Sequence, residues 1–140
     1  MNDRVKEVAA LVRKAVEVQA TRQGYPRDLC GMCAIASFTL ATALAREGVI
    51  AYPVVGSVHG YSHCWVEAEG KVFDITATQF AEYRNDELLS FPVSKKDLFG
   101  YHTHDELTIG SARELKSWPL EQQPEPKLVA ELLESMKRFA

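Results

Sequence analysis

The sequence predicts an α+β fold formed by a single domain over residues 1–140. Three observations lead to this prediction: a helical apolar period near the N-terminus, a second helix made of small and apolar residues, and a following region of β-branched and aromatic residues. The chain has 140 residues, of which 46% are hydrophobic and 25% charged, and these proportions are typical of one globular domain with one core.

The first expected helix covers residues near 2–22. Val5, Val8 and Val12 recur at helical spacing, with charged residues on the opposite side. One face of this helix is therefore expected to pack against the rest of the protein. Gly24 and Pro26 end it, because glycine suits a helix C-terminus and proline disfavours helix in the residue before it.

The second expected helix runs from about Cys33 to Arg46 and is apolar or small on nearly every side. Gly48 follows it, as is usual at the end of a helix. The many alanines allow neighbouring elements to approach closely. We therefore expect this helix at the centre of the fold, packed on a small antiparallel sheet, with Cys33 at its N-terminus.

Residues 49–58, 61–68 and 71–75 are predicted as strands of that sheet. Pro53 cannot donate a hydrogen bond to a neighbouring strand, which indicates a sheet edge or the start of a strand. The Glu-Gly pair at 69–70 is a short hairpin signal between the last two strands. Three antiparallel strands are the minimum that this pattern requires.

The C-terminal part carries weaker signals. Residues 107–109 indicate a further strand, residues 111–118 a short helix, and residues 120–126 a polar linker with prolines. Apolar side chains at helical spacing over residues 127–139 predict a last amphipathic helix. Three roles are open for that helix: a cover for the core, a lid or a partner-binding surface.

Charge and hydropathy argue against two classes of partner. With 16 basic and 19 acidic residues and a net charge of -3, the chain lacks the basic excess that binds nucleic acid or anionic membranes. No apolar run approaches the roughly 20 residues that span a bilayer, and the N-terminus does not show a signal-peptide core. A cytoplasmic protein is therefore expected, with export as an effector by another route left open.

The three cysteines are Cys30, Cys33 and Cys64, an odd number that cannot all pair within one chain, so reduced thiols are expected. Cys33 opens the second helix, whose N–H groups and positive dipole end would stabilise a thiolate and lower the pKa of the thiol. This position makes Cys33 a candidate nucleophile. The simpler interpretation is a small core residue.

His63 and Asp74 lie on the two strands of the expected hairpin. A two-residue turn at 69–70 would place Trp65 opposite Asp74, and His63 shares the face of Trp65. His63 and Asp74 are then diagonal neighbours, roughly 7–8 Å apart between backbone positions and within reach of each other's side chains. A three-residue loop would instead move Asp74 to the other face.

Cys33, His63 and Asp74 together supply the three groups of a thiol enzyme. The thiolate attacks an acyl carbon, the imidazole moves the proton, and the carboxylate fixes the tautomer of the imidazole and stabilises its cation. The alternative for His63 and Asp74 is a structural pair on a partly exposed sheet face.

The segments GMCAIASFTLATALAREGVIAYPVV and HCWVEAEGKVFDIT resemble the core of the transglutaminase-like branch of the papain-like cysteine enzymes. The shared pattern is Gly-x-Cys leading into a central helix, a glycine ending it, His-x-Trp-Val-Glu on a strand, and an Asp followed by Thr on the next. It covers about residues 31–78. The resemblance implies a papain-like core with Cys33 as nucleophile, His63 as general base and Asp74 as orienting acid.

The resemblance also implies a reaction class: thiol-dependent acyl transfer on an amide or related acyl group of a protein or peptide, through a Cys33 thioester. Hydrolysis, deamidation and transamidation all stay open, because nothing in the sequence selects water or an amine as acyl acceptor. The chain is more similar to small stand-alone bacterial members, including leader peptidases of lasso-peptide pathways, than to the large calcium-dependent transglutaminases. No cofactor is implied, since side chains complete the chemistry.

Other residues are weaker candidates for the site. The backbone N–H of Cys33 is the expected oxyanion donor, with Gln19 or Gln23 as unassigned side-chain alternatives. Trp65 either walls the site or packs in the core. Gln79 either lines the cleft or lies exposed on a loop.

Two histidine-bearing stretches have simpler interpretations. His102 and His104 would face the same way on a strand, as half of a metal site, but no third ligand is indicated nearby. Residues 102–106 are therefore expected to form a solvated polar loop. His59, next to Gly60, is expected in a turn.

Two other classes of function stay open. One is a non-catalytic binding or adaptor module on the same fold. The other is a redox or zinc protein built on the pair of Cys30 and Cys33. Against zinc, His63 and Cys64 alternate along a strand, so their side chains point to opposite faces and do not reach one ion without a bulge.

Overall fold

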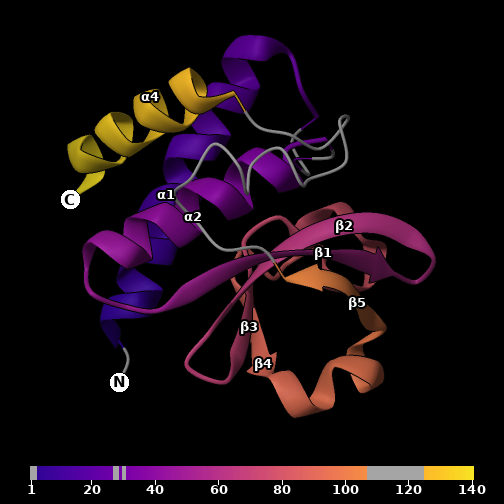
Figure 1. Cartoon of the computed structure of the whole chain (residues 1–140). Helices are drawn as coiled ribbons and strands as arrows, with labels where there is room; N and C mark the ends of the chain where they lie inside the picture. The colour runs from indigo at the N-terminus through magenta and orange to yellow at the C-terminus, as the bar shows by residue number, and fades with distance from the viewer. Residues whose placement is uncertain (1–2, 27–28, 30, 107–124) are drawn as a thin grey trace.

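The computed structural model describes residues 3–26, 29, 31–106 and 125–140. In these residues a layer of helices covers one face of a five-stranded antiparallel sheet (Figure 1). The α-helices of the layer are α1 (Asp3–Gln23), α2 (Cys33–Arg46) and α4 (Pro126–Met136). The strands are β1 (Ala51–Val58), β2 (Tyr61–Ala68), β3 (Lys71–Asp74), β4 (Leu89–Pro92) and β5 (Tyr101–Glu106), in the spatial order β4-β3-β2-β1-β5. The predicted α+β class is confirmed.

The structure confirms both predicted N-terminal helices. α1 buries the face that carries Val5, Val8 and Val12, which enter the same core as α2. α2 begins at Cys33 and ends at Arg46, as the sequence predicts. It contacts α1 and α4 on one side and β1 and β2 on the other. The small, apolar composition of α2 therefore corresponds to a helix surrounded by other elements.

The C-terminal helix α4 packs against α1 and α2. Val129, Leu132 and Leu133 project from it into the helical core, and the chain then ends in the short helix η5 (Lys137–Phe139). These contacts match the role of a cover for the core. The strand expected at 107–109 and the helix expected at 111–118 lie outside the described residues, as does most of the expected linker.

The sheet has two strands beyond the predicted minimum. β4 lies beside β3, and β5 pairs with β1, so β1 is an internal strand. Of the two interpretations of Pro53, the sheet edge is therefore wrong, whereas the position near the start of a strand is observed, since β1 begins at Ala51. Pro53 is accommodated because the described pairing of β5 with β1 begins at Val54, one residue later. The polar stretch from His102 belongs to β5, so the loop expected there is also wrong, although His102 and His104 are exposed.

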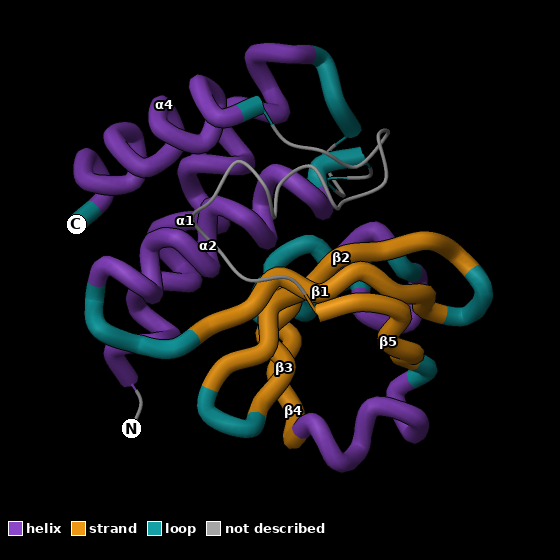
Figure 2. Tube along the Cα trace, viewed as in Figure 1, coloured by secondary structure: helices purple, strands orange, loops and turns teal. Residues whose placement is uncertain are grey.

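The sheet separates two apolar cores. Val66 and Phe73 face the helices, whereas Trp65, Val72 and Tyr101 belong to a second cluster on the opposite face. The short helix η3 (Val93–Phe99) connects β4 to β5, the two edge strands (Figure 2). Its Val93 and Phe99 pack against the second cluster. Side chains that alternate along the strands therefore enter an apolar core on each face of the sheet.

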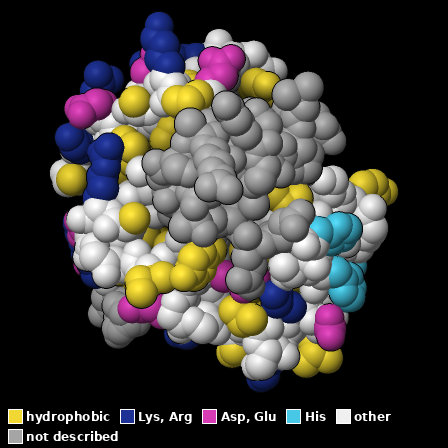
Figure 3. Space-filling view, viewed as in Figure 1, with side chains coloured by type: hydrophobic (Ala, Val, Ile, Leu, Met, Phe, Trp, Pro, Cys, Tyr) yellow, Lys and Arg dark blue, Asp and Glu magenta, His cyan; other side chains and the backbone are white. Residues whose placement is uncertain are grey.

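Within the described residues, no helix has the length and apolar content required to cross a membrane. On the face shown in Figure 3, basic and acidic side chains of the helical layer lie beside one another. That face therefore displays mixed charge over its described helices.

Candidate active site

Cys33 lies at the first position of α2, where the sequence predicts it. The approach to the helix passes through Gly31, whose φ of +93° is a left-handed conformation that glycine adopts without strain. A Cβ added at Gly31 would lie 3.0 Å from the ring of Tyr25. No side chain of a described residue caps the start of α2, and its first turn has no acidic residue. The positive end of the helix dipole is therefore directed at the Cys33 region without a competing carboxylate.

His63 and Asp74 meet through the predicted hairpin. Glu69 and Gly70 have φ values of +53° and +74°, the left-handed pair required by a two-residue turn. The resulting register pairs Val66 with Phe73, which is the register that the predicted two-residue turn requires. The Nε2 atom of His63 lies 2.7 Å from Oδ2 of Asp74, and both side chains are at most 1% exposed.

Asp74 has further hydrogen-bond donors that sequence reasoning missed. The backbone N–H of Thr76 donates to Oδ1 at 2.9 Å, and the hydroxyl of Thr76 donates to the same atom. The hydroxyl of Tyr101 on β5 donates to Oδ2. The Thr76 contact follows from an Asp two residues before a Thr, a common local turn pattern. Tyr101 gave no local signal, because β5 reaches the site only through the pairing of β5 with β1.

The electrostatics of the pair favour an ionised carboxylate beside a charged imidazole. Burial opposes ionisation of Asp74, but the charge of His63 and the hydrogen bonds from His63, Tyr101 and Thr76 outweigh it and lower its pKa. Burial also opposes the imidazolium. The charge and hydrogen bond of Asp74, together with Cys33, nevertheless raise the pKa of His63 to about 10.

Cys33 contacts both Cys64 and His63. Its side chain packs on the small cluster that contains the fully buried Cys64. The hydrogen bond from the Cys64 thiol has the largest effect on the pKa of Cys33 and lowers it, burial raises it, and His63 lowers it further. The net pKa of Cys33 is well below that of an ordinary thiol. The same hydrogen bond and burial raise the pKa of Cys64, so Cys64 keeps its proton.

A cleft of about 600 Å³ opens beside these residues. It lies between the turn that joins β1 to β2 and the segment that follows β3. Its lining consists of Gly31, Cys33, His59, Tyr61, Ser62, Gln79, Phe80, Ala81 and Glu82. Tyr61, at the rim, is 69% exposed. Cys33 is half-buried and lines this open groove, whereas His63 and Cys64 are fully buried.

Gln79 lines this cleft, which is the first of the two interpretations the sequence allowed. It ends the short helix η1 (Ala77–Gln79), and its side-chain nitrogen lies 3.0 Å from Nδ1 of His63. Phe80 packs edge-on against the imidazole of His63, with 4.9 Å between ring centroids. The segment after Asp74 thus contributes three successive contacts to the site, from Thr76, Gln79 and Phe80.

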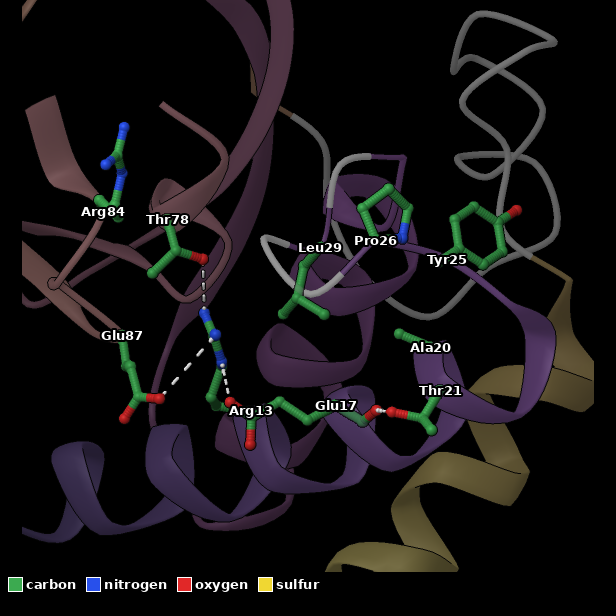
Figure 4. A pocket seen from close by; sticks show the side chains of 10 residues that line it. All are labelled: Arg13, Glu17, Ala20, Thr21, Tyr25, Pro26, Leu29, Thr78, Arg84 and Glu87. Carbon is green, nitrogen blue, oxygen red and sulfur yellow. Dashed lines mark hydrogen bonds and ion pairs between the residues drawn. The ribbon is translucent and has the colours of Figure 1, made fainter. Parts of the chain in front are cut away.

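A second cavity of about 470 Å³ lies where α1 meets the segment after β3 (Figure 4). Arg13 of α1 projects into it and donates hydrogen bonds to the carbonyl of Ile75 at 2.7 Å, to Thr78 at 3.0 Å and to Glu17 at 2.9 Å. Glu87 lies 4.0 Å from the same guanidinium. Arg13 is therefore engaged by protein groups and holds the segment that carries Gln79 in place.

Of the other candidates, the two glutamines of α1 stand apart from the site, Trp65 lies beneath it and His59 lines its cleft. Gln19 lines a groove between α1 and α4, and Gln23 is exposed at the end of α1, so the oxyanion role considered for them has no support. Trp65 is fully buried and donates from Nε1 to Glu67 at 2.9 Å, which makes it a core residue beneath the site. His59 lies in the β1–β2 turn with φ of +51°, as predicted.

Only part of the zinc alternative falls within the described residues. Among them, no group of three or more His, Cys, Asp and Glu side chains is arranged to hold a metal ion. His63 and Cys64 do occupy opposite faces of β2: His63 contacts Trp65 and Tyr101, and Cys64 contacts the α2 side. Cys30, half of the Cys-x-x-Cys pair, lies outside the described residues.

The chain was compared with protein-family models, with curated proteins and with solved structures, and none of the three comparisons found a match.

Proposed function

We propose that this protein is a cysteine-dependent enzyme that transfers the acyl group of an amide or related bond in a protein or peptide. Cys33 is the nucleophile, His63 the general base and acid, and Asp74 the residue that orients His63. A single observation carries the proposal: a half-buried thiol of lowered pKa, which lines an open cleft, contacts a buried imidazole whose Nε2 atom lies 2.7 Å from a buried carboxylate.

The proposed reaction has two halves. The Cys33 sulfur attacks the acyl carbon, the bond to the leaving amine breaks, and His63 gives that amine a proton, leaving an acyl thioester on Cys33. Water or a second amine then attacks the thioester, with His63 accepting its proton, and the thiol is released. Asp74 stays ionised and balances the imidazolium in both halves.

The start of α2 would supply the oxyanion donors, as the backbone N–H of Cys33 lies at the helix terminus. The chemistry is complete in side chains and requires no cofactor. The cleft is open, with the exposed Tyr61 at its rim, and an extended peptide segment suits such a groove better than an enclosed small molecule does. We further infer that the α+β fold is the papain-like, transglutaminase-like version, in a cytoplasmic protein.

The first test is the pH dependence of alkylation at each cysteine, followed by peptide mass spectrometry of the full-length chain. Cys33 should be labelled well below pH 8.5, the value expected for an unperturbed thiol, and faster than Cys64. His63→Ala should remove most of that advantage, because the imidazole contributes to the lowered pKa. An ordinary profile at Cys33, indifferent to His63, would refute the catalytic assignment.

The second test is turnover. Peptide amides, with and without an added primary amine, are incubated with the wild type and with Cys33→Ala. The proposal expects product with the wild type alone and an acyl adduct on Cys33 in the intact-mass spectrum after rapid quenching. Binding of peptides with equal affinity by both proteins, and no product or adduct, would favour the binding-module alternative.

A further inference from the structure

The side-chain amide of Gln79 has two acceptors. Its nitrogen lies 3.1 Å from the backbone carbonyl oxygen of Thr76 and 3.0 Å from Nδ1 of His63. A carbonyl oxygen only accepts hydrogen bonds, so the atom facing Thr76 must be the NH₂ group. The same NH₂ group then directs its second hydrogen at Nδ1 of His63.

This contact determines which nitrogen of His63 carries hydrogen in that arrangement. When His63 is neutral, Nδ1 accepts this hydrogen bond, because a protonated Nδ1 would place two donors face to face; the contact with Gln79 thus opposes the charged imidazole that Asp74 and Cys33 favour. The Asp74 carboxylate lies at Nε2, so the imidazole hydrogen lies on Nε2. Nδ1 is also the nitrogen left for exchange with the thiol of Cys33, which contacts His63. Gln79 and Cys33 therefore compete for one nitrogen.

We propose that Gln79 is a positioning residue that opposes protonation of His63 at Nδ1 and so keeps this nitrogen ready to accept the proton of Cys33. This inference rests on the proposed function for its biological meaning. The contact itself is independent of any substrate. Gln79 must release Nδ1 each time the thiol gives up its proton, and its second hydrogen is then available inside the cleft that it lines.

The local structure holds Gln79 in position for this role. Its backbone N–H is bonded to Thr76, and Thr76 is in turn bonded to Asp74. On the other side of the segment, Arg13 bonds to the carbonyl of Ile75 and to Thr78, and Figure 4 shows the bond to Thr78. Because both ends of the segment are held, the amide cannot drift from His63 without breaking a bond to Thr76.

The other ionisable groups around His63 are known and stay unchanged in the test. Asp74 of β3 and Cys33 of α2 both raise its pKa. Tyr101 of β5 lies 6.2 Å away between ring centroids, Cys64 follows in β2, and His59 and Glu82 line the same cleft. Gln79 differs from Asp74 and Cys33 because it is neutral and donates to the nitrogen that these two groups help to protonate.

The test is the apparent pKa of Cys33 alkylation in Gln79→Met, a variant of similar size that does not donate a hydrogen bond. Losing a donor that opposes the imidazolium should favour the thiolate–imidazolium pair. The apparent pKa of Cys33 should therefore fall by about half a unit to one unit, the equivalent of one hydrogen bond. Gln23→Met, at an exposed position on α1, is the matched control and should leave the pKa unchanged.

A purely structural role for Gln79 predicts the opposite sign. If its loss disturbed Thr76 and hence Asp74, the pKa of His63 would fall and that of Cys33 would rise. A rise or no change in Gln79→Met would overturn the proposal, and Gln79→Ala provides a second variant should the first fold poorly. The shift must also vanish in a His63→Ala background; a shift that persists there would equally overturn it. Neither measurement depends on turnover, so a failure of the proposed function in the turnover test is distinguishable from a failure of the proposal for Gln79.

Discussion

Asp74 is the residue on which the buried polar contacts of the site converge. It accepts hydrogen bonds from His63, Tyr101 and Thr76, which come from two other strands and the following turn. Removing its carboxylate would leave several buried donors without an acceptor. A buried polar group without a partner destabilises the fold by more than one hydrogen bond stabilises it. Substituting Asp74 therefore measures how much the hydrogen bonds of the site contribute to the stability of the fold.

Asp74→Ala, made in a Cys33→Ala background so that the thiol does not titrate, should lower the free energy of unfolding by about 3–5 kcal/mol near pH 6. The loss arises because His63 and Tyr101 keep their burial but lose their acceptor. Urea unfolding of the two proteins measures it. A loss below about 1 kcal/mol would mean that the pair contributes little to the fold.

The difference in unfolding free energy between the same two proteins should depend on pH. Folding lowers the pKa of Asp74, so its contribution is present above the unfolded value near 3.9 and is lost as the pH falls through the folded value. Folding raises the pKa of His63, so its contribution is full below the unfolded value near 6.5 and is lost as the pH rises through the folded value. This difference in stability should be largest between about pH 4 and 6.5, and it should decrease at lower and at higher pH. A constant difference would contradict both pKa directions.

Cys64 should tune the reactivity of Cys33 through the contact between their thiols. In Cys64→Ala the donor is lost, and the apparent pKa of Cys33 alkylation should rise by about half a unit to one unit. Cys64→Ser, which keeps a donor at the same place, is the matched control and should show a smaller rise. Equal behaviour of the two variants would assign the effect to packing.

At the scale of elements, the β2–β3 hairpin brings His63 and Asp74 together. Its two-residue turn at Glu69 and Gly70 sets a register in which the pair shares one face. Because side chains alternate along a strand, the site depends on the number of residues in that turn.

Inserting one glycine between Glu69 and Gly70 should move Asp74 away from His63 and return the pKa of Cys33 alkylation toward 8.5. Inserting two glycines gives a four-residue loop in the original register and should restore most of the low pKa. Alkylation profiles of the two variants, with circular dichroism to follow folding, make the comparison. Identical profiles would show that the register of this hairpin does not control the site.

At the scale of the whole molecule, the site lies where the helical layer meets one end of the sheet. α2 carries Cys33 and is held against the sheet by α1 and α4. The C-terminal helix contributes Leu132 to the shared core, although it follows the rest of the core only after residues 107–124. Stability of the core and placement of Cys33 are therefore coupled through α2.

Leu132→Ala should lower the free energy of unfolding by about 2–5 kcal/mol, as expected for a fully buried leucine. Leu98→Ala is the control, since that side chain is 81% exposed and its loss should change stability by less than about 0.5 kcal/mol. Chemical denaturation gives both values. If α4 were instead a lid, Leu132→Ala would leave stability nearly unchanged and increase the alkylation rate of Cys33.

Local patterns in the sequence determined much of the site. The helix start at Cys33 follows from a glycine before it and an apolar run after it, and the hairpin register follows from Glu69 and Gly70. These features depend on neighbours within about a dozen residues, so periodicity and turn chemistry suffice to predict them. Only the sheet-edge interpretation of Pro53 was wrong, because strand order depends on where distant segments pair.

The tertiary structure alone decided which groups complete the site. Tyr101 reaches Asp74 through the pairing of β5 with β1, and Cys64 meets Cys33 because α2 lies on that face of the sheet. Arg13, 62 residues before Ile75, holds the segment that places Gln79 against His63. Such contacts join residues far apart in the chain, and their geometry is set by the packing of whole elements. No local period encodes that packing, whereas helix starts and turns are encoded by the residues that form them.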